Sequence, residues 1–454
     1  MKTLLYCLLM IPALWAVCSC SAAGDEATTN TATELQQLRA RVEVLEKKLS
    51  ETNQPPPSAR EEPVPAASTL DAMRKAARDE IDTTFEEPDR QTEFTFGALG
   101  LQALNPEISV TGDMLGSYTD SETTNRKLDF LFRGLGIHLE SYLDPYTRFK
   151  AAFEVNESGA RLGEAYMTRY GLLPQVNITL GKFRQQFGVV NRWHKHALDQ
   201  VDFPLPLRMI FGDGGLNQTG GSIEWTMPDF AGLSHETMAQ ITDGSNSRVF
   251  GENADNIPSA LLRYRMYRDL SASTYAELGA SALYGQNNRW PLNNEPSIDK
   301  SLDTLVFGID YSMVWEPTDR MRYHNVTWRT EAYALDKAIL APDGSGRDTL
   351  TPWGAYSYLE GKVCRTLVLG MRVDYYQPNV KPYATGATTL SPLAVTEDGA
   401  QAWQFSPYVT WEQSPYVHFR VEYDYANSRG MDMADNVVWL QCVFAAGPHK
   451  HDRY

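Results

Sequence analysis

The feature that most constrains this chain is a series of sixteen segments, each about ten residues long, in which apolar and polar side chains alternate. The segments are rich in Tyr, Trp, Val and Thr, and a period of two is typical of β-strands with one apolar face. We predict strands over approximately 107–117, 127–142, 146–155, 161–172, 175–186, 218–227, 234–242, 258–268, 270–285, 302–316, 320–336, 351–363, 366–377, 402–412, 416–427 and 436–447.

The connections between these segments alternate between short and long. Those after even-numbered segments are tight turns, such as Asp144-Pro145 and Leu173-Pro174, whereas those after odd-numbered segments are long and polar. The longest connections cover approximately 187–217, 285–301, 336–350 and 378–401. Short turns at one rim and long loops at the other are typical of outer-membrane barrels. An even strand count, between 14 and 18, returns both termini to the short-turn, periplasmic side.

The two faces of each segment differ in polarity. In 416–427 one face carries Val417, Phe419, Val421, Tyr423 and Tyr425, and the other carries His418, Arg420, Glu422 and Asp424. Lipid is the simplest cover for so many apolar faces, and a wet lumen is the simplest environment for the charged ones. The alternative is an exported β-sandwich or solenoid with a solvated face. The main candidates for the lumen wall are Arg133, Arg263, Arg265, Arg329, Arg372, Arg420, Glu422 and Asp424.

Composition excludes two other classes of protein. No internal run approaches the roughly 18 apolar residues of a spanning helix, so a helical membrane protein is excluded. The net charge of -16 argues against a nucleic-acid partner, because phosphate binding needs a concentrated basic surface. We therefore predict an all-β fold, a 16-stranded antiparallel transmembrane β-barrel over 107–454, preceded by an N-terminal coiled-coil extension.

The first 23 residues have the composition of a signal peptide. Lys2 precedes an apolar stretch over 3–17, and small residues follow at 21–23. An alternative is a degenerate lipobox that would make Cys20 a lipidated N-terminus. Cys364 and Cys442 remain in the body of the chain, too few for a disulfide framework.

Residues 24–54 are predicted to form a short coiled coil. Its seam has heptad spacing, with Leu35, Leu38, Val42, Leu45 and Leu49 on one face. Two heptads are marginal alone, so other contacts must hold the chains together. An amphipathic helix packed on its own domain is the alternative. Residues 55–106 are predicted to be a Pro-rich and acidic linker, and the coiled coil is a candidate for peptidoglycan contact.

Three short motifs resemble those of a known family. Asn105 to Asp113, Gly181-Lys182-Phe183 and Gly447-Pro448-His449 resemble porins related to the phosphate-selective porin group. The resemblance implies a sixteen-stranded, homotrimeric channel in the outer membrane of a Gram-negative bacterium. Phosphate selectivity needs a ladder of cations, whereas the lumen faces carry seven basic residues (Arg133, Lys150, Arg263, Arg265, Arg329, Arg372, Arg420) and seven acidic ones (Asp129, Glu154, Asp310, Glu331, Asp374, Glu422, Asp424).

The connection over 186–217 is the main candidate for a pore constriction. In porins of this type the third extracellular loop has the same place in the sequence and folds inward. The apolar side chains of Phe203, Leu205, Leu207, Ile210 and Phe211 would be costly in water, which also favours an inward fold. The candidate constriction residues are Arg192, His194, Lys195, His196, Asp199, Asp202, Arg208 and Asp213. Three bases oppose three acids among them, which predicts weak charge selectivity.

The leading functional hypothesis is a passive diffusion channel for small hydrophilic solutes or ions, without enzymatic activity, cofactor or metal. His194 and His196 could ligate a metal ion, as could His449 and His451, but pore-lining roles are favoured for this spacing. The alternatives are an outer-membrane hydrolase, for which no Gly-x-Ser-x-Gly motif is present, a metal-binding receptor, or a structural tether that uses the coiled coil.

Overall fold

The computed structural model describes residues 106–120, 127–251, 257–287, 302–318, 323–340, 346–384, 391–431, 433 and 436–447. The described residues all belong to one of the two units into which the chain divides, Phe94–Tyr454. The predicted signal peptide, the coiled coil and residues 55–105 of the linker lie outside the described residues, as do Cys20, His449 and His451.

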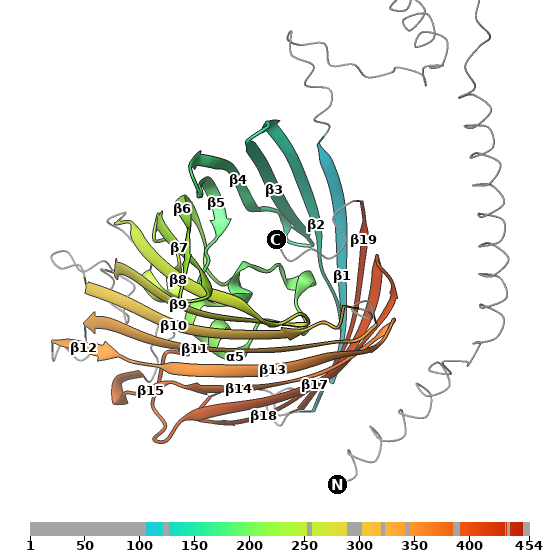
Figure 1. Ribbon diagram of the computed structural model, residues 1–454. Helices are drawn as coiled ribbons and strands as arrows, with labels where there is room; N and C mark the ends of the chain where they lie inside the picture. The colour runs from blue at the N-terminus through green and yellow to red at the C-terminus, as the bar shows by residue number, and fades with distance from the viewer. Residues whose placement is uncertain are drawn as a thin grey trace, which may run out of the picture. The chain divides into compact units, whose positions relative to one another are not determined.

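Sixteen strands form a closed antiparallel barrel (Figure 1). Each strand pairs with its neighbours in the chain, and β1 pairs with both β2 and β19, which closes the barrel. The sixteen-stranded barrel predicted from the sequence is confirmed. The barrel strands are β1 (Glu107–Asp120), β2 (Leu128–Asp144), β3 (Thr147–Asn156), β4 (Gly159–Leu173), β5 (Val176–Arg184), β6 (Asn217–Phe230), β7 (Leu233–Thr242), β8 (Ser259–Ser271), β9 (Thr274–Asn287), β10 (Leu302–Trp315), β11 (Asn325–Leu340), β13 (Trp353–Cys364), β14 (Leu367–Gln377), β17 (Gln401–Ser414), β18 (Val417–Arg429) and β19 (Asn436–Ala446).

Shorter elements lie in the long connections. Strand β12 (Arg347–Leu350) pairs with the end of β11 that β13 does not reach, so β12 and β13 together occupy one place in the barrel. Pro352 lies between them and has no N–H for a ladder bond, which explains the break. The others are β15 (Asn379–Val380), β16 (Ala394–Val395), η2 (Val190–Arg192), η3 (Lys195–Ala197), η4 (Pro382–Ala384), α5 (Leu205–Phe211) and α6 (Ser247–Phe250). Among the described residues, no helix is long and apolar enough to cross a membrane.

The burial of the barrel strands alternates as the sequence predicts. In β18 Val421 is 42% exposed, whereas the neighbouring side chain of Arg420 is only 5% exposed. The outer positions of other strands are also apolar and exposed, for example Phe307 and Ile309 of β10. An outer surface of this kind is what the hydrocarbon of a bilayer covers.

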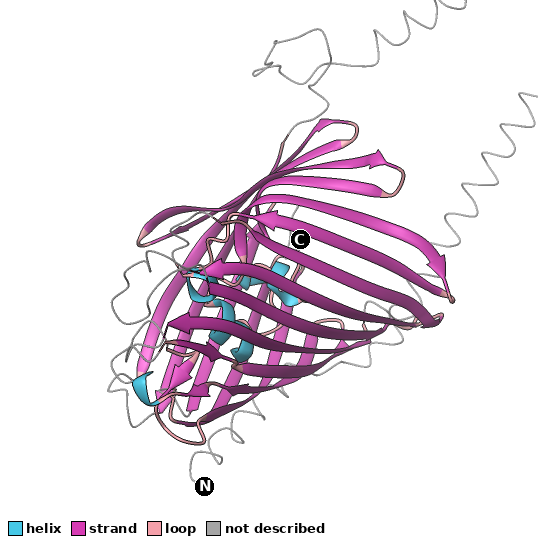
Figure 2. Cartoon of the chain, turned by 90° about the vertical axis from the view of Figure 1, so that its left-hand side faces the viewer, coloured by secondary structure: helices cyan, strands magenta, loops and turns pink. Residues whose placement is uncertain are grey.

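The apolar core of the protein lies inside the barrel. The connection between β5 and β6, residues 185–216, contains η2, η3 and α5 and is called the inward loop below. Figure 1 labels α5 within the ring of strands, and Figure 2 shows helices inside this ring. Phe203, Leu205, Leu207 and Ile210 of this loop are fully buried and pack with wall residues of β8 to β14, such as Leu283 and Val306.

Candidate functional site: the inward loop and the cavities beside it

The first turn of the inward loop is fixed by one buried carboxylate. Glu331 Oε1 accepts hydrogen bonds from the backbone N–H groups of Val189 (3.2 Å) and Val190 (3.1 Å) and from the hydroxyl of Tyr356 (2.7 Å). Its Oε2 accepts from the hydroxyl of Tyr333 at 2.7 Å. A side chain at Gly188 would collide with this carboxylate, since a Cβ there would lie 2.0 Å from Oε2, and Gly188 also has a φ of +64°. The anchor therefore requires glycine at this position.

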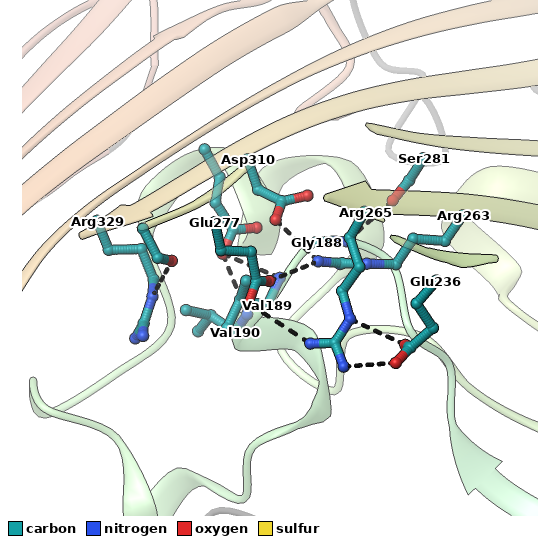
Figure 3. Close-up of polar contacts among 12 residues, drawn as sticks. Gly188, Val189, Val190, Glu236, Arg263, Arg265, Glu277, Ser281, Asp310 and Arg329 are labelled. Atoms are coloured by element: carbon teal, nitrogen blue, oxygen red, sulfur yellow. Dashed lines mark hydrogen bonds and ion pairs between the residues drawn. The ribbon is translucent and has the colours of Figure 1, made fainter. Parts of the chain in front are cut away.

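The N–H of Gly188 adds a neighbouring contact, donating to Ser281 Oγ at 3.3 Å (Figure 3). Further along the loop, two other wall carboxylates accept from its backbone. Glu422 Oε2 accepts from the N–H of Val201 at 2.8 Å, and Asp374 Oδ1 accepts from that of Leu205 at 3.0 Å. Acidic wall residues thus hold the loop.

Wall arginines bind the carbonyl groups of the same loop. Arg420 donates to the carbonyl oxygen of Leu198 at 2.9 Å, and Arg372 donates to that of Asp202 at 2.9 Å. The guanidinium of Arg329 lies over the ring of Trp193, 4.6 Å from its centroid. These three arginines therefore bind the inward loop to the barrel wall.

Helix α5 has local sequence signals at both ends. Pro204 is its N-cap and Pro206 lies in its first turn, where a fixed φ favours helix and no N–H is needed. Gly212 ends it with a φ of 86°, and the N–H of Gly212 donates to the carbonyl of Arg208 at 2.9 Å. The helix places Leu205, Leu207 and Ile210 against the wall.

Most of the predicted lumen-wall residues contact the wall or the inward loop rather than open space. Arg263 pairs with Asp310 at 2.8 Å and Arg265 pairs with Glu236 at 2.7 Å (Figure 3). Asp424 accepts from the indole of Trp439 at 2.8 Å. Of the eight predicted residues, Arg133 lines the larger of the two cavities described below, whereas seven line neither of these two: Arg263, Arg265, Arg329, Arg372, Arg420, Glu422 and Asp424.

A cavity of about 640 Å³ separates the inward loop from β1 to β5. Its walls include three histidines and more bases than acids. Within the described part of the chain, the bases are Arg133, Arg161, Lys182, Arg184, Lys195 and Arg248, the acids are Asp113, Glu154 and Asp213, and the histidines are His138, His194 and His196. Arg161 and Lys182 form no ion pair with a described residue.

A smaller cavity of about 140 Å³ lies beside β3 to β7, and its lining residues on β3 to β5 are nearer the short-turn end than those of the larger cavity. Its charged lining consists of Arg148, Lys150, Arg192 and Glu224 among the described residues. Arg148 also forms an ion pair with Glu140. Basic side chains therefore predominate along both cavities.

The predicted constriction residues separate into two groups. His194, Lys195, His196 and Asp213 line the larger cavity and Arg192 lines the smaller one. The other three face protein, which breaks the equal balance of charge expected from the sequence: Asp199 accepts from the hydroxyl of Tyr358 at 2.7 Å, and Asp202 lies 3.2 Å from Lys195 and 3.8 Å from Arg208.

The environment of Asp202 favours its charged form. Burial alone would raise the pKa of this carboxyl, but the charges of Arg208, Lys195 and Arg133 outweigh burial and lower the pKa to about 2. Asp202 is therefore ionised at neutral pH, and the positive charges around it balance its negative charge.

Five basic cavity residues were absent from the predicted site: Arg148, Arg161, Lys182, Arg184 and Arg248. Lys150 appeared only among the lumen charges. The sequence contained a signal for two of these residues. Arg148 and Lys150 are two residues apart on β3, so the strand period places them on the same inner face. In the described part of the chain, no group of three or more His, Cys, Asp or Glu residues is arranged to hold a metal ion.

Comparison with known proteins supplies no family assignment, since no family model matches. An uncharacterized protein of Aquifex aeolicus is 28% identical over 212 residues, which is 42% of this chain and 42% of that protein. The alignment thus spans less than half the length of this relative.

Three solved structures similar to this one are outer-membrane proteins. They are the channel DcaP of Acinetobacter baumannii (TM-score 0.49, 13% identity, 76% of this chain and 97% of that one), an anion-selective porin from Comamonas acidovorans (0.49, 10%, 76% and 99%) and OmpT of Vibrio cholerae in a trimer form (0.46, 10%, 75% and 99%). The strand pairing and apolar outer face of this chain are those of a transmembrane β-barrel of the outer-membrane type.

Proposed function

We propose that this protein is a porin that conducts small hydrophilic solutes passively and prefers anions. The observation that carries the proposal is the lining of the larger cavity, where six basic residues face three acidic ones among the described residues. The smaller cavity has three basic residues and one acidic one. A path lined by one sign of charge concentrates counter-ions of the other sign.

The distribution of partners explains why a nearly balanced set of wall charges can give an anion path. Glu331, Asp374 and Glu422 accept hydrogen bonds from the inward loop, so their charge is compensated on the side of the barrel that the loop covers. Arg161 and Lys182 lie on the opposite side, beside the cavity. Charges next to confined water act more strongly on a passing ion than charges paired within the wall.

The inward loop is proposed to narrow this path. Arg192, His194, Lys195 and His196 are loop residues that line the cavities, and Asp213 of the loop adds one acid to the larger cavity. Small oxyanions, phosphate among them, are the proposed preferred solutes, because guanidinium groups such as that of Arg161 present several donors to an oxyanion.

Assembly as a homotrimer is part of the proposal. The predicted seam over 24–54 would add contacts between chains, and peptidoglycan is a candidate partner for this extension. The protein should run as an SDS-resistant trimer that dissociates on boiling. A monomer by light scattering in mild detergent would contradict this part of the proposal.

Reversal potentials in planar bilayers under a KCl gradient test the function. We expect the wild type to favour Cl⁻, and Arg161→Glu with Lys182→Glu to move the reversal potential toward K⁺. Arg365→Glu is the matched control, because this exposed turn residue lies outside both cavities. A cation-selective wild type, or equal shifts in the two variants, would refute the anion path.

A further inference from the structure

Three histidines meet where the two cavities approach each other. His138 of β2 lies 5.1 Å from His194 and 5.3 Å from His196 of the inward loop, measured between ring centroids, and the two loop rings are 5.5 Å apart. All three line the larger cavity. They come from segments more than 50 residues apart, so the fold rather than the local sequence assembles the cluster.

This histidine cluster, formed by His138, His194 and His196, lies at the boundary between the linings of the larger and the smaller cavity. The two cavities share no lining residue among the described ones. On the inward loop, Arg192 lines the smaller cavity and His194 lines the larger one. On β3, Lys150 lines the smaller cavity and Ala152 lines the larger one. Ala152 pairs with His138 in the register of β2 and β3. The three rings therefore lie beside the step from one cavity to the other along the inward loop and β3.

From this geometry we infer that His138, His194 and His196 are determinants of charge selectivity whose protonation strengthens the preference for anions. The inference rests on the proposed anion path. An imidazole with an ordinary pKa near 6.5 gains its charge between about pH 8 and pH 5, and each added charge at a narrow place lowers the barrier for an anion and raises it for a cation.

The charged groups around the cluster permit such a response. His194 Nε2 lies 2.9 Å from Glu164 Oε2, and the other oxygen of Glu164 accepts from the backbone N–H of Arg184 at 2.7 Å. Glu164 is buried and lines neither cavity, so its carboxylate faces His194 and not the solute. Other charged groups on neighbouring elements are Asp113 of β1, Arg133 and Glu140 of β2, Arg148, Lys150 and Glu154 of β3, Arg161 of β4, Lys182 and Arg184 of β5, and Arg192 and Lys195 of the inward loop.

The test measures the Cl⁻/K⁺ permeability ratio from reversal potentials between pH 8 and pH 5.5, a range in which ordinary carboxylates stay ionised. We expect the wild-type ratio to rise by roughly threefold or more as pH falls across this range. The variant His138→Gln, His194→Gln, His196→Gln should lose this rise. His324→Gln, in a short turn outside both cavities, should keep it.

The outcomes separate this inference from the proposed function. Two results would refute the inferred role of the histidines and leave the proposed anion path unaffected. One is an anion-selective wild type whose permeability ratio does not change with pH, and the other is a triple variant that keeps the wild-type pH response. A cation-selective wild type whose ratio still rises as pH falls, with a rise that the triple variant abolishes, would refute the anion path and support the inference about the histidines. Circular dichroism and heat-modifiable gel mobility establish that each variant is a folded barrel.

Discussion

Glu331→Ala should release the first turn of the inward loop without releasing the whole loop. The substitution leaves the N–H groups of Val189 and Val190 without their acceptor. A buried donor without a partner costs about 1–3 kcal/mol, so the two together cost about 2–6 kcal/mol. The loss is local, because Glu422 and Asp374 still accept from the loop further along the chain.

The apolar contacts decide that the loop stays inside. Phe203, Leu205, Leu207, Ile210 and Phe211 are all buried. Burial of each such side chain stabilises by about 1.5–3 kcal/mol, so the five contribute at least roughly 7 kcal/mol. This exceeds the loss at Glu331, and the barrel ladder itself does not depend on this carboxylate.

Hydrogen exchange followed by NMR or mass spectrometry in detergent checks this reasoning. A loss of 2 kcal/mol corresponds to roughly thirtyfold faster exchange, so the amides of Val189 and Val190 should exchange at least that much faster in Glu331→Ala. The amides of Val201 and Leu205 should stay protected. Glu331→Gln is the matched control, since its amide oxygen can keep both backbone bonds, and we expect a much smaller effect.

Two results would refute the argument. Unchanged exchange at Val189 and Val190 would mean that Glu331 is not their anchor. Equal acceleration over the whole of 185–216 would mean that the loop opens as one cooperative unit and that the apolar contacts do not hold it separately.

Two further predictions concern the outer face and the loop charges. Val421→Arg should lower the free energy of unfolding of the barrel by about 2–4 kcal/mol if Val421 lies near the bilayer midplane, as measured by denaturant unfolding in lipid. The control Val421→Leu should have little effect. If arginine is tolerated, this position lies outside the apolar band of the barrel. Asp202→Asn should lower the stability of the protein at neutral pH, because a carboxyl whose pKa falls from 3.8 to about 2 stabilises the folded state above its unfolded pKa and loses this contribution as pH falls through about 2. The difference in unfolding midpoint between wild type and Asp202→Asn should therefore have its largest value above about pH 4 and decrease toward pH 2. A difference that does not depend on pH would mean that the substitution acts through packing and not through charge.

Local sequence was sufficient for the strands because a barrel strand needs only an alternating face and a turn at each end. Val421 and Arg420 are neighbours in sequence and lie on opposite faces, as the period of two requires. The inward fold of 185–216 could be predicted for a similar reason, since Phe203, Leu205 and Leu207 need burial whichever wall they reach. Prolines and glycines marked many of the short turns and both ends of α5.

The sequence alone could not distinguish charges that face water from charges that face protein. Arg263 and Arg161 both belong to alternating strands, yet Arg263 pairs with Asp310, 47 residues later in the chain, and Arg161 lies beside the cavity. Whether a wall charge is compensated depends on which wall the inward loop covers. That choice is made by contacts such as those of Glu331 with Val189 and Val190, which join positions about 140 residues apart.

The sequence by itself therefore determined the strand count, the two faces of the barrel and the inward position of one long loop, because each depends on periodicity or on the cost of exposing apolar side chains. Only the tertiary structure decided where open space remains and which charges line it. The physical reason is that an ion responds to uncompensated charge beside water, and compensation is a property of pairs of residues that folding brings together from distant parts of the chain.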